Sequence, residues 1–162
     1  MEPETKIEYL RRSYFSVDGL WFVNCEARLS FDAALEIDEA VWRSMGKIQA
    51  RKARELAGGL PGLEGLALAL PIKFESEGWG YRLTKGDDAL SVEVDSCPWY
   101  KILERSGRTH LEPQISKAIC QTEYAEWAKE FGEGIVFSQS RSRESGRCTL
   151  RFGEGGPGQS AE

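Results

Sequence analysis

The sequence has only one histidine, His110, and it contains no Walker loop, no GxGxxG segment and no HExxH segment. With a single histidine, neither a Ser-His-Asp hydrolase nor an imidazole-rich zinc site is expected. No motif in the sequence indicates nucleotide chemistry. A lone histidine such as His110 is more typical of a surface or helix-cap position than of a metal ligand or a general base.

Positive charge and long apolar runs are also scarce. The 162 residues include 21 Lys and Arg against 26 Asp and Glu, which gives a net charge of -5. The electrostatic field of a net negative protein does not favour binding to a phosphate backbone or to an anionic lipid surface. No run approaches the roughly 18 apolar residues of a membrane span, and residues 1–4 are polar and acidic where a signal peptide is basic and then apolar. We therefore expect a cytoplasmic protein with no nucleic-acid and no membrane partner.

Four cysteines stand at positions 25, 97, 120 and 148, and no two of them form a CxxC pair. A reducing cytosol would keep them as thiols. The length and the 41% of hydrophobic residues suit a single domain. We expect one α+β domain over residues 1–152 and a disordered tail over residues 153–162, because that tail has no large apolar side chain to bury.

Helical patterns fill the first half of the chain. Residues 6–15 are weakly helical, and Ser16 or Asp18 can then cap the next helix with a side-chain oxygen. A longer helix is expected from about residue 38 to the glycine pair at 58 and 59. Pro71 is expected to end a short apolar helix over residues 62–70.

The second half changes to twofold alternation, which is typical of strands with one buried face. Residues 79–84 and 90–94 predict one β-hairpin, and residues 135–140 and 148–152 predict a second. Residues 98–105 and about 110–131 predict helices between them. The sequence therefore predicts four antiparallel strands with the helical N-terminal half and the other helices packed on one face.

Cys97 is the first candidate for chemistry because Pro98 follows it. Proline is favoured at the first position of a helix, so Cys97 becomes the helix cap. The free N–H groups and the positive end of the helix dipole favour a thiolate there. The alternative interpretation is a small buried residue that closes a strand-to-helix turn.

Cys120, Tyr124, Trp127 and Phe131 would share one face of the helix over residues 110–131. Such a stripe is usually part of the core. A pocket is the other interpretation, since the phenol and the indole bring polar atoms that need partners. Glu123 lies beside the stripe and could act as an acid or base.

Cys148 begins the last strand pattern and is expected to point toward the helices, where Cys97 and Cys120 could meet it. Three such thiols are candidate ligands for zinc or iron. Structural zinc sites usually contain ligand pairs two to four residues apart, and these cysteines have no such spacing. We therefore predict no cofactor and keep the three-cysteine metal site as an alternative.

A row of cations, Arg43, Lys47, Arg51 and Arg54, follows one face of the long helix. We expect these side chains to pair with nearby carboxylates. The alternative is a site for an acidic partner or an anion.

Several short segments in the second half share one pattern: Cys97-Pro98-Trp99, Ile119-Cys120 with Glu123-Tyr124, and Gly146 and Cys148 before Leu150-Arg151-Phe152. This pattern resembles the L-2-amino-thiazoline-4-carboxylic acid hydrolase-like family. Upstream segments, Asp18-Gly19-Leu20-Trp21-Phe22, Ala34-Leu35-Glu36 and Asp38-Glu39-Ala40-Val41-Trp42, resemble a related branch, a domain of unknown function found in anaerobic bacteria and archaea. The resemblance implies hydrolysis of a C=N centre in a small heterocycle, with Cys97 as the first candidate residue and Cys120 and Cys148 as supporting positions.

Two functions therefore stay open. In the first, Cys97 is the nucleophile of a hydrolase and Glu123 or Tyr124 moves the proton. In the second, the protein is a non-catalytic module that binds a small molecule or a metal, in a pocket lined by Trp79, Trp99, Cys120 and Trp127. A small-molecule ligand or substrate is the expected partner, and a homodimer is possible on general grounds.

Overall fold

The computed structural model describes residues 1–141 and 146–155. Its elements in chain order are α1 (Pro3–Arg28), α2 (Phe31–Leu56), α3 (Gly62–Glu77), β1 (Gly80–Lys85), β2 (Ala89–Ser96), α4 (Pro98–Arg105), a 3-10 turn (Thr109–Leu111), α5 (Glu112–Ile115), a π-helical turn (Ser116–Cys120), α6 (Gln121–Phe131), β3 (Ile135–Arg141) and β4 (Cys148–Glu154). None of the helices in the described ranges is long and apolar enough to cross a bilayer.

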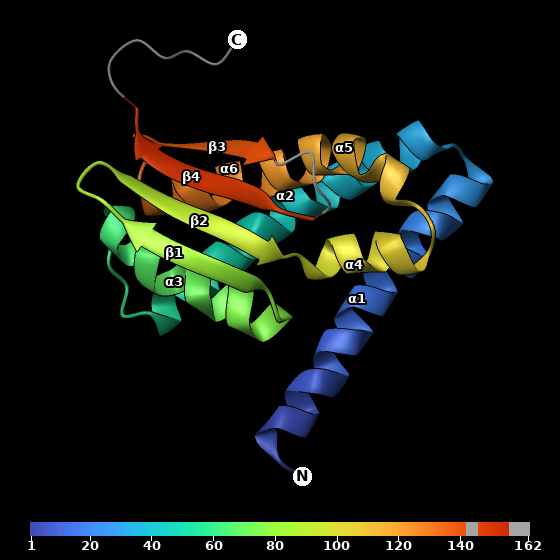
Figure 1. The fold of residues 1–162 in the computed structure, drawn as a ribbon, viewed down its shortest axis with the longest axis horizontal. Coiled ribbons are helices and arrows are strands. Elements are labelled where there is room, and N and C mark those ends of the chain that lie inside the picture. The colour runs from blue at the N-terminus through green and yellow to red at the C-terminus, as the bar shows by residue number, and fades with distance from the viewer. Residues whose placement is uncertain (142–145, 156–162) are drawn as a thin grey trace.

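The strands form one antiparallel sheet in the order β1-β2-β4-β3. The two predicted hairpins are present, and β4 joins them by pairing with β2. Val92 lies opposite Leu83 of β1 and Leu150 of β4. Helices α3 and α6 lie against one face of the sheet, α2 packs on α3 and α6, and α1 packs on α2 (Figure 1). The α+β prediction is therefore confirmed.

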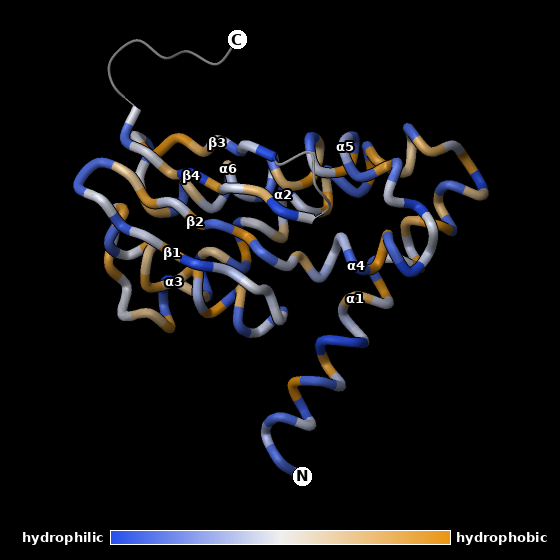
Figure 2. The backbone as a smooth tube through the Cα atoms, in the orientation of Figure 1, coloured by the Kyte–Doolittle hydropathy of each residue, from blue (hydrophilic) through white to orange (hydrophobic). Residues whose placement is uncertain are grey.

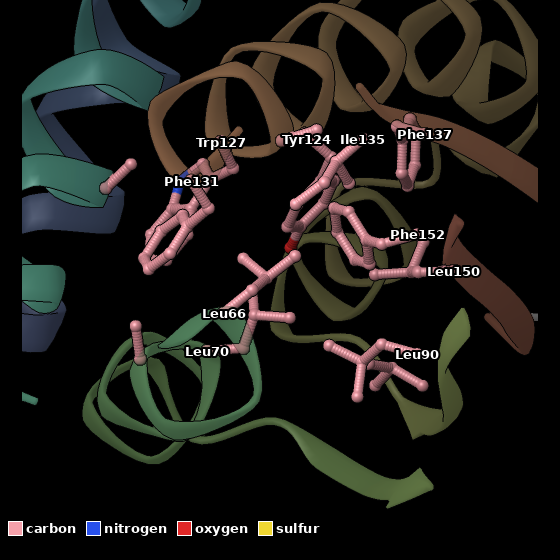
Figure 3. Close-up of a cluster of buried hydrophobic side chains, with 14 of the residues drawn as sticks. Leu66, Leu70, Leu90, Tyr124, Trp127, Phe131, Ile135, Phe137, Leu150 and Phe152 are labelled. Atoms are coloured by element: carbon pink, nitrogen blue, oxygen red, sulfur yellow. The ribbon is translucent and has the colours of Figure 1, made fainter. Parts of the chain in front are cut away.

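The core lies between the sheet and helices α3 and α6 (Figure 3). Twofold alternation on the strands places Leu90, Val92 and Phe152 on the inner face, where each has no exposed surface. Phe74 of α3 and Tyr124 of α6 meet them from the helical side. The inner positions of the strands are apolar because only this face of the sheet is covered.

The expected helix break at Ser16 or Asp18 is wrong, because α1 runs unbroken from Pro3 to Arg28. Asp18 does not cap a helix; it accepts a hydrogen bond from the indole N–H of Trp42 at 3.2 Å. The actual cap is Ser30, whose hydroxyl accepts the N–H of Ala33 at 3.1 Å. Helix α2 therefore begins at Phe31, earlier than residue 38.

Pro71 does not end its helix either. Helix α3 continues to Glu77 although Pro71 has no N–H to donate to the carbonyl of Ala67. An interior proline costs about 3 kcal/mol. The residues beyond it include Phe74, which is fully buried, and Lys73, which forms two buried ion pairs. Their contacts offset that cost.

The helix predicted over about residues 110–131 is present, since the 3-10 turn, α5, the π-helical turn and α6 follow one another without a break from Thr109 to Phe131. One smaller boundary differs. Gly153 and Glu154 belong to β4 rather than to a tail, since Gly153 pairs with Ala89 and Val136. Residues 142–145 of the connection between β3 and β4, and residues 156–162 of the predicted tail, lie outside the described ranges.

Candidate functional site

Three of the four cysteines line one cavity of about 60 Å³. Cys97 is the N-cap of α4, Cys120 ends the π-helical turn, and Cys148 is the first residue of β4. Trp79, Trp99 and Tyr124 line the same cavity. We refer to it as the three-cysteine cavity.

The sheet register brings two of these cysteines to one place. Val94 of β2 pairs with Cys148 of β4, and the chain leaves β2 two residues later to reach Cys97. The π-helical turn presents Ser116 and Cys120 to the same space. The sequence predicted this convergence from the inward register of β4, and the structure places all three residues there.

Burial keeps the three thiols protonated. It raises the pKa of Cys97 to about 12, although the backbone N–H groups of Tyr100 and Trp99 act to lower it. Burial also raises the pKa of Cys120, and a charge on Cys97 would raise it further. Burial raises the pKa of Cys148 as well. The helix terminus does favour the Cys97 thiolate, but loss of hydration outweighs it.

Tyr124 also lines this cavity, and its hydroxyl has no protein partner in the described part of the chain. The side chain is fully buried, and a phenol hydroxyl of that kind usually finds a hydrogen bond. Burial raises its pKa further above the ordinary value for a phenol, and the negative charge of Glu123 adds to the effect. Tyr124 is therefore a neutral donor.

Two other predicted residues do not line this cavity. Trp127 is fully buried in the core, where it stacks on Phe131 with 6.3 Å between ring centroids. Glu123 turns to Lys73, whose Nζ lies 2.7 Å from its Oε1. The stripe predicted on α6 is thus core at Trp127 and Phe131, and it reaches the cavity at Tyr124.

A buried charge cluster lies beside the core, and sequence reasoning missed it. Lys73 of α3 contacts Glu77 and Glu123 at 2.7 Å each, and its side chain is only 2% exposed. Its Nζ also donates to Oε1 of Gln49 at 3.2 Å and lies 5.5 Å from the ring centre of Trp42. The signal available in the sequence was a Lys and a Glu four residues apart, directly after the apolar run of this helix.

Two more carboxylates lie near the indole of Trp42. Burial raises the pKa of Asp18 to about 6. Burial, and secondarily the charge of Asp18, raises the pKa of Asp38 to about 7. Both side chains are half-buried between α1 and α2, so this part of the helical layer holds protons at a pH where exposed aspartates have lost them.

A larger groove of about 900 Å³ runs between α1 and α4. Phe15 and Asp18 line it from α1, and Trp99 lines it from α4. Trp99, Leu103 and Ile115 also line the three-cysteine cavity. Helix α4, which has no buried residue, is therefore a wall common to both spaces.

Within residues 1–141 and 146–155, no group of three or more His, Cys, Asp or Glu residues is arranged to hold a metal ion. The three thiols of Cys97, Cys120 and Cys148 line a common cavity without forming such a group. His110 lies exposed in the 3-10 turn. The predicted zinc or iron alternative finds no formed site in this arrangement.

The cationic row on α2 is engaged with its surroundings, as expected. Arg43 contacts Glu39 at 2.7 Å, and Lys47 contacts Glu126 at 3.4 Å. The other two members reach the end of α6: Arg51 donates twice to the carboxylate of Glu130, and Arg54 donates to the carbonyl of Glu130. One contact of this row thus lies within α2, and the other three connect α2 to α6.

These features define a small α+β domain with a cavity lined by three half-buried cysteines, beside a layer of helices that contains buried charges. Residues 5–139 match the model of a family of unknown function, DUF6125, and the protein belongs to that family. The match includes Cys97 and Cys120 and ends before Cys148 and β4. No curated protein matches the chain.

Proposed function

We propose that the protein is a small-molecule-binding module whose ligand occupies the three-cysteine cavity. The observation that carries this proposal is Tyr124, a residue of the cavity wall whose fully buried hydroxyl has no hydrogen-bond partner in the described ranges. Leaving such a group unpaired costs about 1–3 kcal/mol. A ligand that accepts this hydrogen bond would recover that energy.

The surroundings limit the chemistry of the ligand. Neutral thiols and the rings of Trp79 and Trp99 favour an apolar or sulfur-containing body rather than a charged one. A volume of about 60 Å³ suits only a few heavy atoms. A small uncharged heterocycle with one acceptor atom for Tyr124 satisfies these conditions, and a larger one would require α4 to move.

Hydrolysis is the second candidate, and it rests on two points. One is the resemblance of the cysteine segments to the thiazoline hydrolase-like family. The other is the pair of N–H groups, from Trp99 and Tyr100, that favour the Cys97 thiolate. In this reaction Sγ of Cys97 bonds to the carbon of a C=N group while its proton goes to the nitrogen. Water then bonds to that carbon as the C–S bond breaks, and one water proton returns to Sγ. The C–N bond of the resulting carbinolamine breaks last, its hydroxyl proton passing to the leaving nitrogen, so that a C=O group and an amine are formed. Tyr124 lies at the cavity to relay a proton, whereas Glu123 is held by Lys73.

A screen of small five-membered heterocycles by thermal shift tests the binding proposal. Tyr124→Phe should weaken any binder by about 3- to 10-fold, the worth of one neutral hydrogen bond, and should leave the unliganded protein equally or more stable. Tyr9→Phe is the matched control, because it removes the same hydroxyl from a tyrosine that is 70% exposed on α1. Equal effects of the two substitutions on affinity would refute a ligand hydrogen-bonded to Tyr124.

Alkylation of each cysteine across pH, read by peptide mass spectrometry with and without a chelator, separates the candidates. For a binding module, Cys97, Cys120 and Cys148 should stay unreactive until the protein unfolds or the pH becomes strongly alkaline. Reaction of Cys97 at a pH well below the pKa of a free thiol, roughly 8.5, would favour the hydrolase instead. Turnover of a C=N heterocycle that persists in Cys97→Ser would refute Cys97 as the nucleophile of a hydrolase. Alkylation of the three cysteines only after addition of the chelator would indicate a bound metal.

A further inference from the structure

Helix α4 is a wall of the three-cysteine cavity that does not belong to the core. The strand wall contains Leu150, which is 1% exposed, and the α6 wall contains Tyr124, which has no exposed surface. Helix α4 contributes Trp99, Tyr100 and Leu103, and none of its eight residues is buried. Figure 2 shows hydrophobic and hydrophilic positions mixed along this short helix, as expected when only one side lies on the protein. Helix α4 can therefore leave the cavity without opening the core.

The connections at both ends of α4 allow it to turn. The chain passes from β2 to α4 through Cys97 alone, in an extended conformation. Gly107 follows the other end with a φ of +69°, and a Cβ at this position would have no atom within 4 Å. A glycine in open space absorbs changes of backbone angle at little cost. Helix α5 also lines the cavity, but it continues without a break into the π-helical turn and α6, so it cannot move alone.

A cluster of four aromatic rings holds α4 against the helical layer. Trp99 packs edge to face on Phe15 and Tyr14 of α1, with ring centroids 4.5 and 5.7 Å apart. It packs in the same way on Trp42 of α2 at 5.2 Å. We call these four rings the Trp99 latch. Since Trp42 is only 3% exposed, the latch is fixed to the core through α2. Aromatic pairs of this geometry stabilise a contact beyond the area that they bury.

The other contacts of this segment lie at its margins. Tyr100 packs closely on Gly146, where a Cβ would lie 2.9 Å from Cδ1 of Tyr100. Arg108, just beyond the helix, contacts Glu26 of α1 at 2.6 Å. This ion pair keeps the far end of the segment attached to α1 when Trp99 leaves its partners.

Open space lies on the other side of α4. The groove of about 900 Å³ is lined by Trp99 and Leu103 of α4 and by Phe15 of α1. The first two residues also line the three-cysteine cavity. Once the rings of the latch separate, α4 can therefore shift into the groove and away from the thiols.

The cavity is too small for a ring as it stands. Its volume is about 60 Å³, whereas an apolar cavity that takes a six-membered ring has about 150 Å³. The walls from the sheet and from α6 are parts of the packed core, which does not expand without loss of contacts. The additional space must come from α4.

We propose that α4 is a lid on the three-cysteine cavity, held shut by the Trp99 latch, and that a ligand enters when Trp99 separates from its three ring partners. The inference rests on the proposed function only in assigning a ligand to the cavity, because the opening is a property of the unliganded protein. The latch then sets how often the cavity is accessible. Phe15 and Trp42 thus regulate a site that, among the described lining residues, they do not touch.

Two measurements on the full, unliganded chain detect the opening. Hydrogen exchange at the amides of α4 reports its detachment, because a free helix of eight residues is too short to stay helical. Alkylation of Cys120 by iodoacetamide reports access to the cavity, since Cys120 lies on the π-helical turn and not on the lid. Rare openings escape a brief labelling and appear in one prolonged over many hours. Relative to the unfolded chain, both rates should give one opening constant, larger than that of the amides of α6.

Phe15→Ala weakens the latch without leaving a hole in the cavity, because Phe15 lines the groove and is not among the described residues of the cavity wall. Both opening constants should rise by about 3- to 10-fold, the worth of one aromatic pair. Phe22→Ala is the matched control. Phe22 is also half-buried on α1 and lines the same groove, but it packs on Phe31 of α2 at 5.8 Å. Global unfolding breaks either contact, so both variants should speed exchange in α6, and only Phe15→Ala should speed the reactions at α4 and Cys120.

Four results would overturn the lid. The first is an equal effect of the two substitutions at α4 and Cys120. The second is a wild-type protein in which Cys120 reacts only through global unfolding, and the third is one in which it reacts as fast as in the unfolded chain. The fourth is faster alkylation in Phe15→Ala without faster exchange in α4, which would place the entrance elsewhere. A heterocycle screen without a binder would leave all these results unchanged, so the two proposals can fail separately.

Discussion

Replacing Lys73 by methionine should cost more stability than removal of any exposed cation. Lys73→Met keeps most of the side-chain volume but leaves the carboxylates of Glu77 and Glu123 without the ammonium that lies 2.7 Å from each. Both carboxylates are at most 7% exposed, so water cannot replace it. Removing one partner of a buried ion pair costs about 3–5 kcal/mol. At about 3 °C per kcal/mol for a chain of this size, Tm should fall by about 9–15 °C.

The loss should depend on pH, and its direction follows from Glu123. Burial already raises the pKa of Glu123 in the wild type, and Lys73 is the neighbour that lowers it. Without Lys73 that pKa rises further, so the folded variant binds protons that the unfolded chain has lost. The free energy of unfolding of the variant should then fall as pH rises above about 4.3 and through the folded-state pKa. The deficit is expected to be larger at pH 8 than at pH 5.

Urea unfolding at both pH values, followed by tryptophan fluorescence and circular dichroism, measures the effect. Lys129→Met is the control, because Lys129 also contacts a glutamate, Glu126 at 2.8 Å, but is 63% exposed; its loss should stay under about 1 kcal/mol. Adding Glu123→Gln to Lys73→Met should recover part of the stability by removing one unpaired charge. A deficit no larger than that of the control, or one that is equal at pH 5 and pH 8, would refute this reasoning.

Two further predictions concern the helical layer. Burial is the main reason why the pKa of Asp18 is raised from 3.8 to about 6 and that of Asp38 from 3.8 to about 7. The free energy of unfolding should therefore fall as the pH rises from 3.8 to about 7. Asp38→Asn should flatten that slope in a pH series of urea titrations, and an unchanged slope would contradict the burial argument. Gly65→Ala should destabilise the fold by more than about 2 kcal/mol, since its Cβ would overlap the carbonyl oxygen of Leu60. Gly19→Ala should raise Tm slightly, because the space around Gly19 in α1 is open. A Tm that is lower for Gly19→Ala than for Gly65→Ala would contradict this argument.

The strands were predictable because their signal is local. Leu90, Val92 and Val94 alternate with polar residues, and that period follows directly from a sheet with one covered face. The position of Cys97 as a helix cap was also readable, since Pro98 fixes the start of α4. Both inferences need only the few residues on either side.

The chemistry at Cys97 was not predictable in the same way. Its pKa depends on burial, and burial is supplied by segments distant in the sequence, such as the π-helical turn and β4. Pro71 was misjudged for a related reason, because the contacts that carry α3 past it come from the core and from Glu123 of α6. The Lys73 and Glu77 pair carried a local signal, but its buried partner Glu123 lies 50 positions away in the sequence.

The strand order also constrains how the chain folds. Strand β4 lies between β2 and β3, so the centre of the sheet is a pairing of residues 89–94 with residues 148–153. During synthesis, the inner edge of β2 therefore has no native partner until β4 has left the ribosome. An unpaired edge that carries Leu90, Val92 and Val94 can join another strand of the same kind. Closing the sheet is a late, long-range step, and aggregation of nascent chains competes with it for as long as that edge stays open.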